Sequence, residues 1–140
     1  MGERRVLATT AATLARAIAA QGPSRYDEAL GLIAVSREAP DEDLSTRAVG
    51  QGLHARILAD RGRFREAEEL ARLAAGLAAQ TDFLSEHADT LLELSHVLAA
   101  AGQASEAHSV ATQALDLYQR KGNLPGARES LQYLTLSAPA

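Results

Sequence analysis

The fold is decided by the stretch ADTLLELSHVLAAAG at residues 88–102, which the chain carries in two earlier versions without a gap. These are ATTAATLARAIAAQG at residues 8–22 and AVGQGLHARILADRG at residues 48–62. In each version apolar residues recur three and four positions apart, which indicates one buried face of an amphipathic helix. Each version ends in glycine, the residue type that most often follows a helix C-terminus. The sequence therefore predicts a repeat with a period of 40 residues.

A second helix is expected after each of these glycines. A Glu-Ala pair places Ala29, Ala67 and Ala107 at matching points of the three second helices. Ahead of the first of them, Ser24 and Asp27 have the spacing of a capping box, with an aspartate in place of the usual glutamate. Each unit therefore predicts a pair of helices.

The boundaries between units and the end of the array are also visible in the sequence. Pro40 and Thr81, each followed by aspartate, separate the three units. A closing helix is expected to begin at Asn123, a capping residue, with Pro125 in its first turn. The prediction is one domain over residues 1–140, made of seven helices. It contains helix pairs at about 5–40, 42–81 and 83–122 and a capping helix at about 123–136.

The composition supports an all-α class. The chain has no Trp, two Phe and three Tyr, and it is rich in Ala and Leu, which are the best helix formers. Cysteine is absent, which excludes disulfides and thiolate metal sites. A net charge of −4 argues against nucleic acid as a partner, and we see neither a signal peptide nor a membrane segment. We therefore expect a cytoplasmic protein with no nucleic-acid or membrane partner.

These residues resemble the tetratricopeptide repeat. In that family small residues lie midway along the first helix and at successive turns of the second. The third unit matches this pattern best, with Leu91, Leu94, Ser95, Leu98, Gly102, Ala107, Ala111, Ala114 and Leu115. The resemblance implies a right-handed superhelix of helix-turn-helix repeats, an α-solenoid that serves as a scaffold for protein binding.

The chain departs from the family in two respects. Its period is 40 residues, where the family has 34. The bulky aromatic residue of the first helix is replaced by Ala11, Gln51 and Leu91. In both respects it is similar to the tetratricopeptide-like regions of large bacterial signalling and transcription regulators, so a regulatory segment of a larger protein is one expectation.

The resemblance also implies a concave groove, lined by the first helix of each pair, that grips a peptide, a helix or a partner domain. Arg16, Arg56 and His96 lie at equivalent positions there and form a ladder of cations suited to an acidic segment. The alternative is that these cations are solvated or pair with acids of the same chain. Further candidates for the groove are Asp60, Asp89, Leu92, Glu93 and Arg128.

The leading hypothesis for function is a protein-interaction module. Alternatives are a structural or self-association element that forms a homodimer, and a sensor of a small ligand or peptide. No catalytic residue, metal site or cofactor is expected. His54 stands where the other units have leucine, so it is interpreted as a tolerated interface residue rather than a ligand.

Overall fold

The computed structural model describes residues 2–137, and within that range the protein consists of seven α-helices and no strand. This confirms the all-α class and the predicted number of helices. The helices are α1 (Gly2–Ala19), α2 (Tyr26–Ser36), α3 (Leu44–Asp60), α4 (Phe64–Ala79), α5 (Leu84–Ala100), α6 (Ala104–Lys121) and α7 (Leu124–Ser137). None of the seven is long and apolar enough to cross a membrane.

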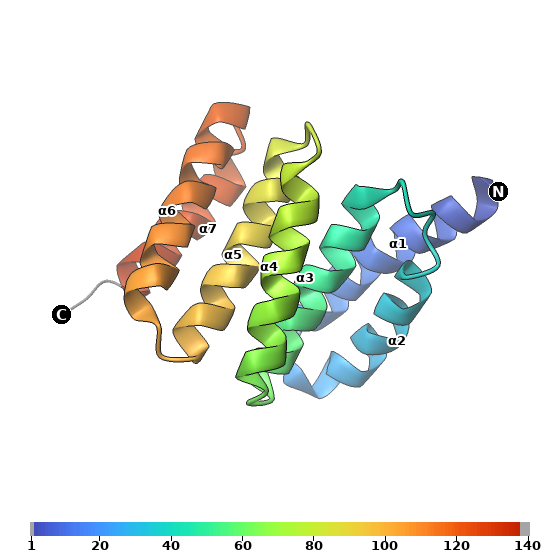
Figure 1. The fold of residues 1–140 in the computed structure, drawn as a ribbon, viewed down its shortest axis with the longest axis horizontal. Coiled ribbons are helices and arrows are strands. Elements are labelled where there is room, and N and C mark those ends of the chain that lie inside the picture. Colours follow the sequence, from blue (N-terminus) through green and yellow to red (C-terminus); the bar gives the residue numbers. More distant parts are fainter. Residues whose placement is uncertain (1, 138–140) are drawn as a thin grey trace.

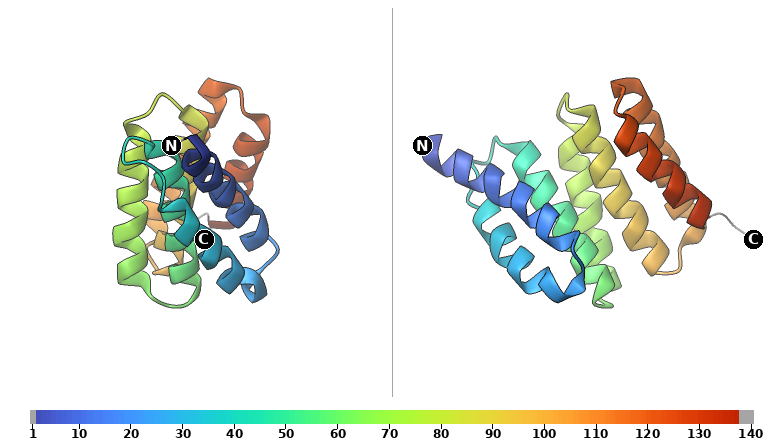
Figure 2. Two further views of the ribbon diagram at one scale, coloured as in Figure 1. Left: turned by 90° about the vertical axis from the view of Figure 1, so that its right-hand side faces the viewer. Right: turned by 180° about the vertical axis from the view of Figure 1, so that it is seen from behind.

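Consecutive helices pack as antiparallel pairs, and the pairs stand side by side in two layers (Figure 1). Helices α2, α4 and α6 form the layer nearer the viewer, and α1, α3, α5 and α7 lie behind them. The closing helix α7 packs on α6 and α5. The view from behind in Figure 2 shows the second layer, with α1 at one end and α7 at the other.

Small residues allow the paired helices to approach closely. Ala29, Ala67 and Ala107 are fully buried, as their matching positions in the sequence predict. Gly62 and Gly102 adopt φ angles of 83° and 84° directly after α3 and α5, a conformation in which other residues are strained. The loops at these points are therefore short, and each pair is a compact unit.

The start of α2 differs from the prediction. Ser24 does not cap this helix, because Pro23–Arg25 form a short 3-10 helix instead and α2 begins at Tyr26 without a side-chain cap. The fixed φ of Pro23 suits the first turn of a helix and places that turn earlier than expected. At the other end of the chain the predicted cap is confirmed, since Asn123 Oδ1 accepts the Gly126 N–H at 3.0 Å.

The core is divided into two clusters of unequal size. The larger one runs through α3, α4, α5, α6 and α7. The smaller one joins α1 and α2 to the rest through Leu53 and Ile57 of α3. Helix α2 has 11 residues where α4 has 16, so the first pair offers less surface to its neighbour. The first pair is thus the more loosely attached part of the array.

Candidate functional site on the inner face

We call the surface lined by α1, α3, α5 and α7 the inner face. Two adjoining pockets open on it, and both are bordered by Arg16, Leu53 and Glu93. The larger has a volume of about 140 Å³ and also touches Arg56 of α3 and Glu129 of α7. The first and last helices of this layer therefore contribute to one pocket.

Arg16 of α1 reaches past α3 to α5. Its Nη1 lies 3.2 Å from Oδ2 of Asp89. The other carboxylate oxygen of Asp89 accepts a hydrogen bond from the hydroxyl of Tyr118, a buried residue of α6. Burial and the charge of Asp89 raise the pKa of Tyr118, so the phenol stays protonated and remains a donor. Asp89 is held from two sides and cannot swing away without losing both contacts.

Arg56 of α3 and Glu93 of α5 form the second pair, with 3.6 Å between Nη1 and Oε1. The Glu93 side chain is 19% exposed, and its other oxygen, Oε2, is buried without a hydrogen-bond partner in the described residues. Burial raises the pKa of Glu93 to about 7, although Arg56 and Arg16 act in the opposite direction. At neutral pH this carboxyl group is therefore protonated in about half of the molecules.

His96 of α5 completes the set. Its Nε2 lies 2.7 Å from Oδ1 of Asp60 on α3. Oδ2 of Asp60 accepts a hydrogen bond from the Tyr26 hydroxyl. Partial burial alone would raise the pKa of Asp60, but the hydrogen bonds from Tyr26 and His96 lower it. Asp60 therefore stays ionised, and desolvation together with this bond raises the pKa of Tyr26 to about 12.

The structure places Arg16, Arg56 and His96 on the inner face, where each pairs with an acid of a different helix. Of the two alternatives raised by the sequence, pairing within the chain is therefore the one observed. The side chains of Arg16 and Arg56 nevertheless remain 47% and 41% exposed. Ion pairs of this exposure contribute roughly 0–1 kcal/mol each, so they can be exchanged for other partners at small cost.

Two of the predicted groove residues lie elsewhere. Leu92 is 8% exposed and belongs to the larger core cluster, because an apolar side chain is stabilised by leaving water. Arg128 is exposed on α7 and borders neither pocket. The residue that follows it, Glu129, takes the position at the pocket instead, which a shift of one residue along the predicted closing helix would have found.

Neither metal chemistry nor a known relative assigns a role to the inner face. No group of three or more His, Asp or Glu side chains within residues 2–137 is arranged to hold a metal ion. Comparison with protein-family models, with curated proteins and with solved structures finds no match. Any role of the inner face is therefore inferred from the arrangement of its side chains.

Proposed function

We propose that the chain is a protein-interaction module of the tetratricopeptide type, in which the inner face holds an extended segment of a partner protein. Three helix pairs and a closing helix, with alanines at the crossing points, support the repeat architecture. The charged residues of α1, α3 and α5 converge on the same face. A row of donors beside acceptors suits a peptide, whose backbone presents both N–H and C=O groups.

The orphaned oxygen of Glu93 is the observation that carries this proposal. Burying a carboxylate oxygen without a donor destabilises the fold by roughly 1–3 kcal/mol. Leu53 is the equivalent residue of α3, so an apolar side chain fits this register of the repeat. Glu93 therefore does not stabilise the fold, although it borders a pocket. Its presence is better explained if a bound partner supplies the hydrogen-bond donor that Oε2 lacks.

The protonation state of Glu93 also determines whether an acidic or a neutral side chain of the partner binds better in the pocket. When Glu93 is ionised it neutralises Arg56, and the pocket holds two arginines and two glutamates. When Glu93 takes up a proton, the charge of Arg56 is left uncompensated next to Arg16. An acidic side chain of the partner then meets a site whose charge is one unit more positive than before. Binding of an acidic segment is thus coupled to proton uptake by Glu93.

The experiment compares three sets of short peptides of equal length: acidic, their Asn/Gln counterparts, and basic. We expect the acidic set to bind best, with affinity rising from pH 8 to pH 6 and falling with added salt. Replacing Arg16 and Arg56 together by alanine should weaken this binding by roughly tenfold, since each provides a charge-assisted contact. Isothermal titration calorimetry also counts the protons taken up.

Glu93→Gln separates the coupling from the rest of the site. In this variant the rise in affinity from pH 8 to pH 6 should disappear, whereas Glu38→Gln, an exposed control in the turn after α2, should retain it. Unchanged affinity in the Arg16/Arg56 double variant would remove the inner face as the binding surface. A pH dependence that persists in Glu93→Gln would overturn the coupling alone.

Self-association is the second candidate, and the outer side of α1 favours it. Val6, Leu7 and Leu14 are 64%, 62% and 47% exposed on a helix with no helix of the described residues packed on that side. Exposed apolar groups at the end of a helical stack commonly pair with another chain. Sedimentation equilibrium decides between the two: a dimer that Leu7→Glu and Leu14→Glu convert to monomer supports this reading.

A further inference from the structure

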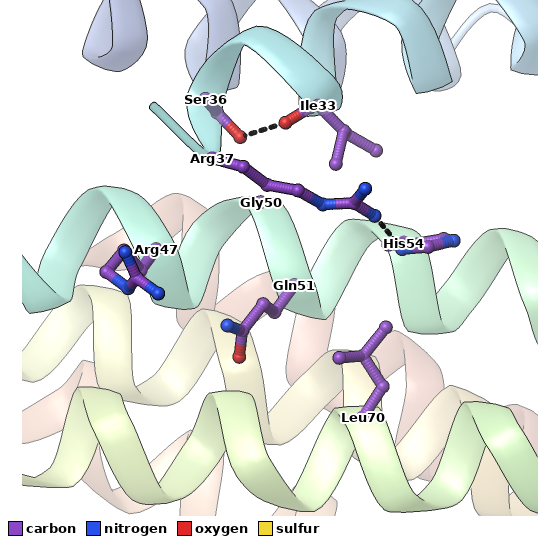
Figure 3. A pocket seen from close by; sticks show the side chains of 8 residues that line it. All are labelled: Ile33, Ser36, Arg37, Arg47, Gly50, Gln51, His54 and Leu70. Atoms are coloured by element: carbon purple, nitrogen blue, oxygen red, sulfur yellow. Dashed lines mark hydrogen bonds between the residues drawn. The ribbon is translucent and has the colours of Figure 1, made fainter. Parts of the chain in front are cut away.

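A separate cavity lies where α2, α3 and α4 meet, away from the inner face (Figure 3). Its volume is about 200 Å³, enough for roughly six water molecules or a ligand with that number of non-hydrogen atoms. Polar and apolar residues share its wall: Ile33, Ser36, Arg37, Arg47, Gly50, Gln51, His54 and Leu70.

The cavity exists because α3 departs from the third unit at three positions. Gly50, Gln51 and His54 occupy the places that Thr90, Leu91 and Leu94 take on α5, where the two leucines are buried. Helix α2 also ends at Ser36, so no further turn covers this part of α3. Gly50 and the early end of α2 leave the space, and the hydrogen-bonding side chains of Gln51 and His54 make it polar.

His54 acts as a hydrogen-bond acceptor in this cavity. Arg37 Nη2 lies 2.9 Å from His54 Nδ1, and because a guanidinium can only donate, Nδ1 must accept. Partial burial, followed by the charges of Arg37 and Arg63, lowers the pKa of His54 and keeps the ring neutral. The bond holds the Arg37 side chain across the cavity, as Figure 3 shows, without neutralising its charge.

The cavity carries an excess of positive charge. Arg37 forms no ion pair with any carboxylate of residues 2–137. Arg47 lies 3.2 Å from Asp41, whose side chain is almost fully exposed to water. The wall also contains an unused acceptor, since Gln51 Oε1 is buried and has no hydrogen-bond partner in the described residues.

We propose that this cavity binds a small organic carboxylate that also carries a hydrogen-bond donor. The carboxylate lies against Arg37, which has a free charge, and Arg47 adds positive charge at the other end of the cavity (Figure 3). A hydroxyl of the ligand donates to Gln51 Oε1. Its short carbon chain packs between Ile33 and Leu70, the apolar parts of the wall. This site is independent of the partner-binding role assigned to the inner face.

The test uses three probes of matched size: lactate, lactamide and propionate. Lactate has the carboxylate and the hydroxyl, lactamide lacks the charge, and propionate lacks the donor. Titration of the ¹⁵N-labelled protein at pH 7 should shift the signals of the Gln51 side-chain amide and the His54 ring with lactate in the millimolar range. Lactamide should bind roughly tenfold more weakly, and propionate should bind between the two.

Two variants locate the binding. Arg37→Gln should weaken lactate binding by roughly tenfold, whereas Arg120→Gln, which removes the same charge from the exposed end of α6, should leave it unchanged. The double variant Gln51→Leu/His54→Leu replaces the hydrogen-bonding groups of the wall by the apolar residues of the third unit, and it should abolish binding while raising the melting temperature. Both effects are measured on protein whose helix content is confirmed by circular dichroism.

Several outcomes overturn the proposal. These are the absence of lactate-dependent shifts, equal shifts with lactamide, and equal losses in the Arg37 and Arg120 variants. Inorganic phosphate that binds as tightly as lactate would reduce the site to a general anion site. A tripeptide with a free carboxyl terminus that binds when lactate does not would assign the carboxylate to a polypeptide end, contrary to the proposal.

Discussion

The two junctions between helix pairs are built on the same 40-residue register and differ in what they do. At the second junction, where α5 packs on α3 and α4, leucines and alanines of one large core meet. At the first, where α3 packs on α1 and α2, the packing is thinner and a polar cavity opens. Copies of one unit can therefore diverge until one junction provides stability and the other provides a site.

The difference comes from few side chains at matching positions. Leu94 of α5 is buried in the larger core, and its counterpart His54 of α3 borders the cavity. A fully buried leucine contributes roughly 2–3 kcal/mol by leaving water. A neutral histidine held by one arginine contributes far less, since its hydrogen bond replaces one to water. The loose junction is the consequence of giving up apolar contacts for hydrogen-bonding groups.

Truncation of the side chains at these two matching positions tests most directly whether the two junctions differ in stability. Leu94→Ala should lower the free energy of unfolding by about 3 kcal/mol, through lost burial and the space left behind. His54→Ala should lower it by less than about 1 kcal/mol, because that position already borders a cavity. Urea denaturation followed by circular dichroism measures both. Equal losses in the two variants would show that the junctions do not differ in stability.

The buried acid on the inner side of the second junction gives the next largest effect. The raised pKa of Glu93, about 7, means that the folded chain keeps a proton that the unfolded chain releases near pH 4.5. Stability should therefore fall as pH rises from 4.5 through 7. Glu93→Gln should stabilise the protein by roughly 2 kcal/mol at pH 8 and by little at pH 4.

Denaturation curves of the wild type and of Glu93→Gln at several pH values measure this difference, and Glu38→Gln serves as the control. The difference between wild type and Glu93→Gln isolates one group, since all other titrating residues are common to both. A constant difference from pH 4 to pH 8 would mean that Glu93 has an ordinary pKa.

Two glycines of α3 distinguish the junctions by the smallest expected change in stability. A methyl group at Gly52, which faces the second junction, would meet its neighbours at 3.6 Å or more, an ordinary contact. Gly52→Ala should therefore stabilise the helix by about 1 kcal/mol. At Gly50 the methyl would lie 2.6 Å from Ser36 Oγ. That hydroxyl is buried and donates to the Ile33 carbonyl, so it would lose this hydrogen bond by moving aside.

Gly50→Ala should accordingly lower the melting temperature, while Gly52→Ala raises it. Differential scanning calorimetry of the two variants, which add the same single methyl two residues apart, resolves the opposite signs. A higher melting temperature in both variants would show that α2 moves to accommodate the methyl group at residue 50. The first junction would then be more easily deformed than its contacts indicate.

The sequence was sufficient to predict the helices because their signals are local. Glycines at equal spacing mark the ends of α1, α3 and α5, and Asn123 marks the start of α7. The prediction for Ser24 was wrong because a capping box and a proline turn compete over the same few residues. Pro23 decided that competition through its fixed φ.

The ion pairs of the inner-face residues could not be predicted from sequence patterns. Arg16 and Asp89 are 73 positions apart, and their contact depends on how the helices of the three pairs are placed in space. Periodicity predicts which side of a helix faces the groove, but it carries no information on distance between helices. The cavity at α2, α3 and α4 has a signal in the sequence, because Gln51 and His54 stand where the third unit has leucines. The repeat alone did not show that these residues border a cavity.

The contact from Arg16 to Asp89 also has a mechanical consequence. It ties the first pair directly to the third, over a junction whose apolar packing is the weaker of the two. The tie resists tilting of the first pair against the third by roughly 0–1 kcal/mol, the contribution of an ion pair of this exposure. We expect a partner that captures either residue to remove this contact and to let the first pair tilt more easily. Occupancy in the middle of the array would in this way change the distance between its ends.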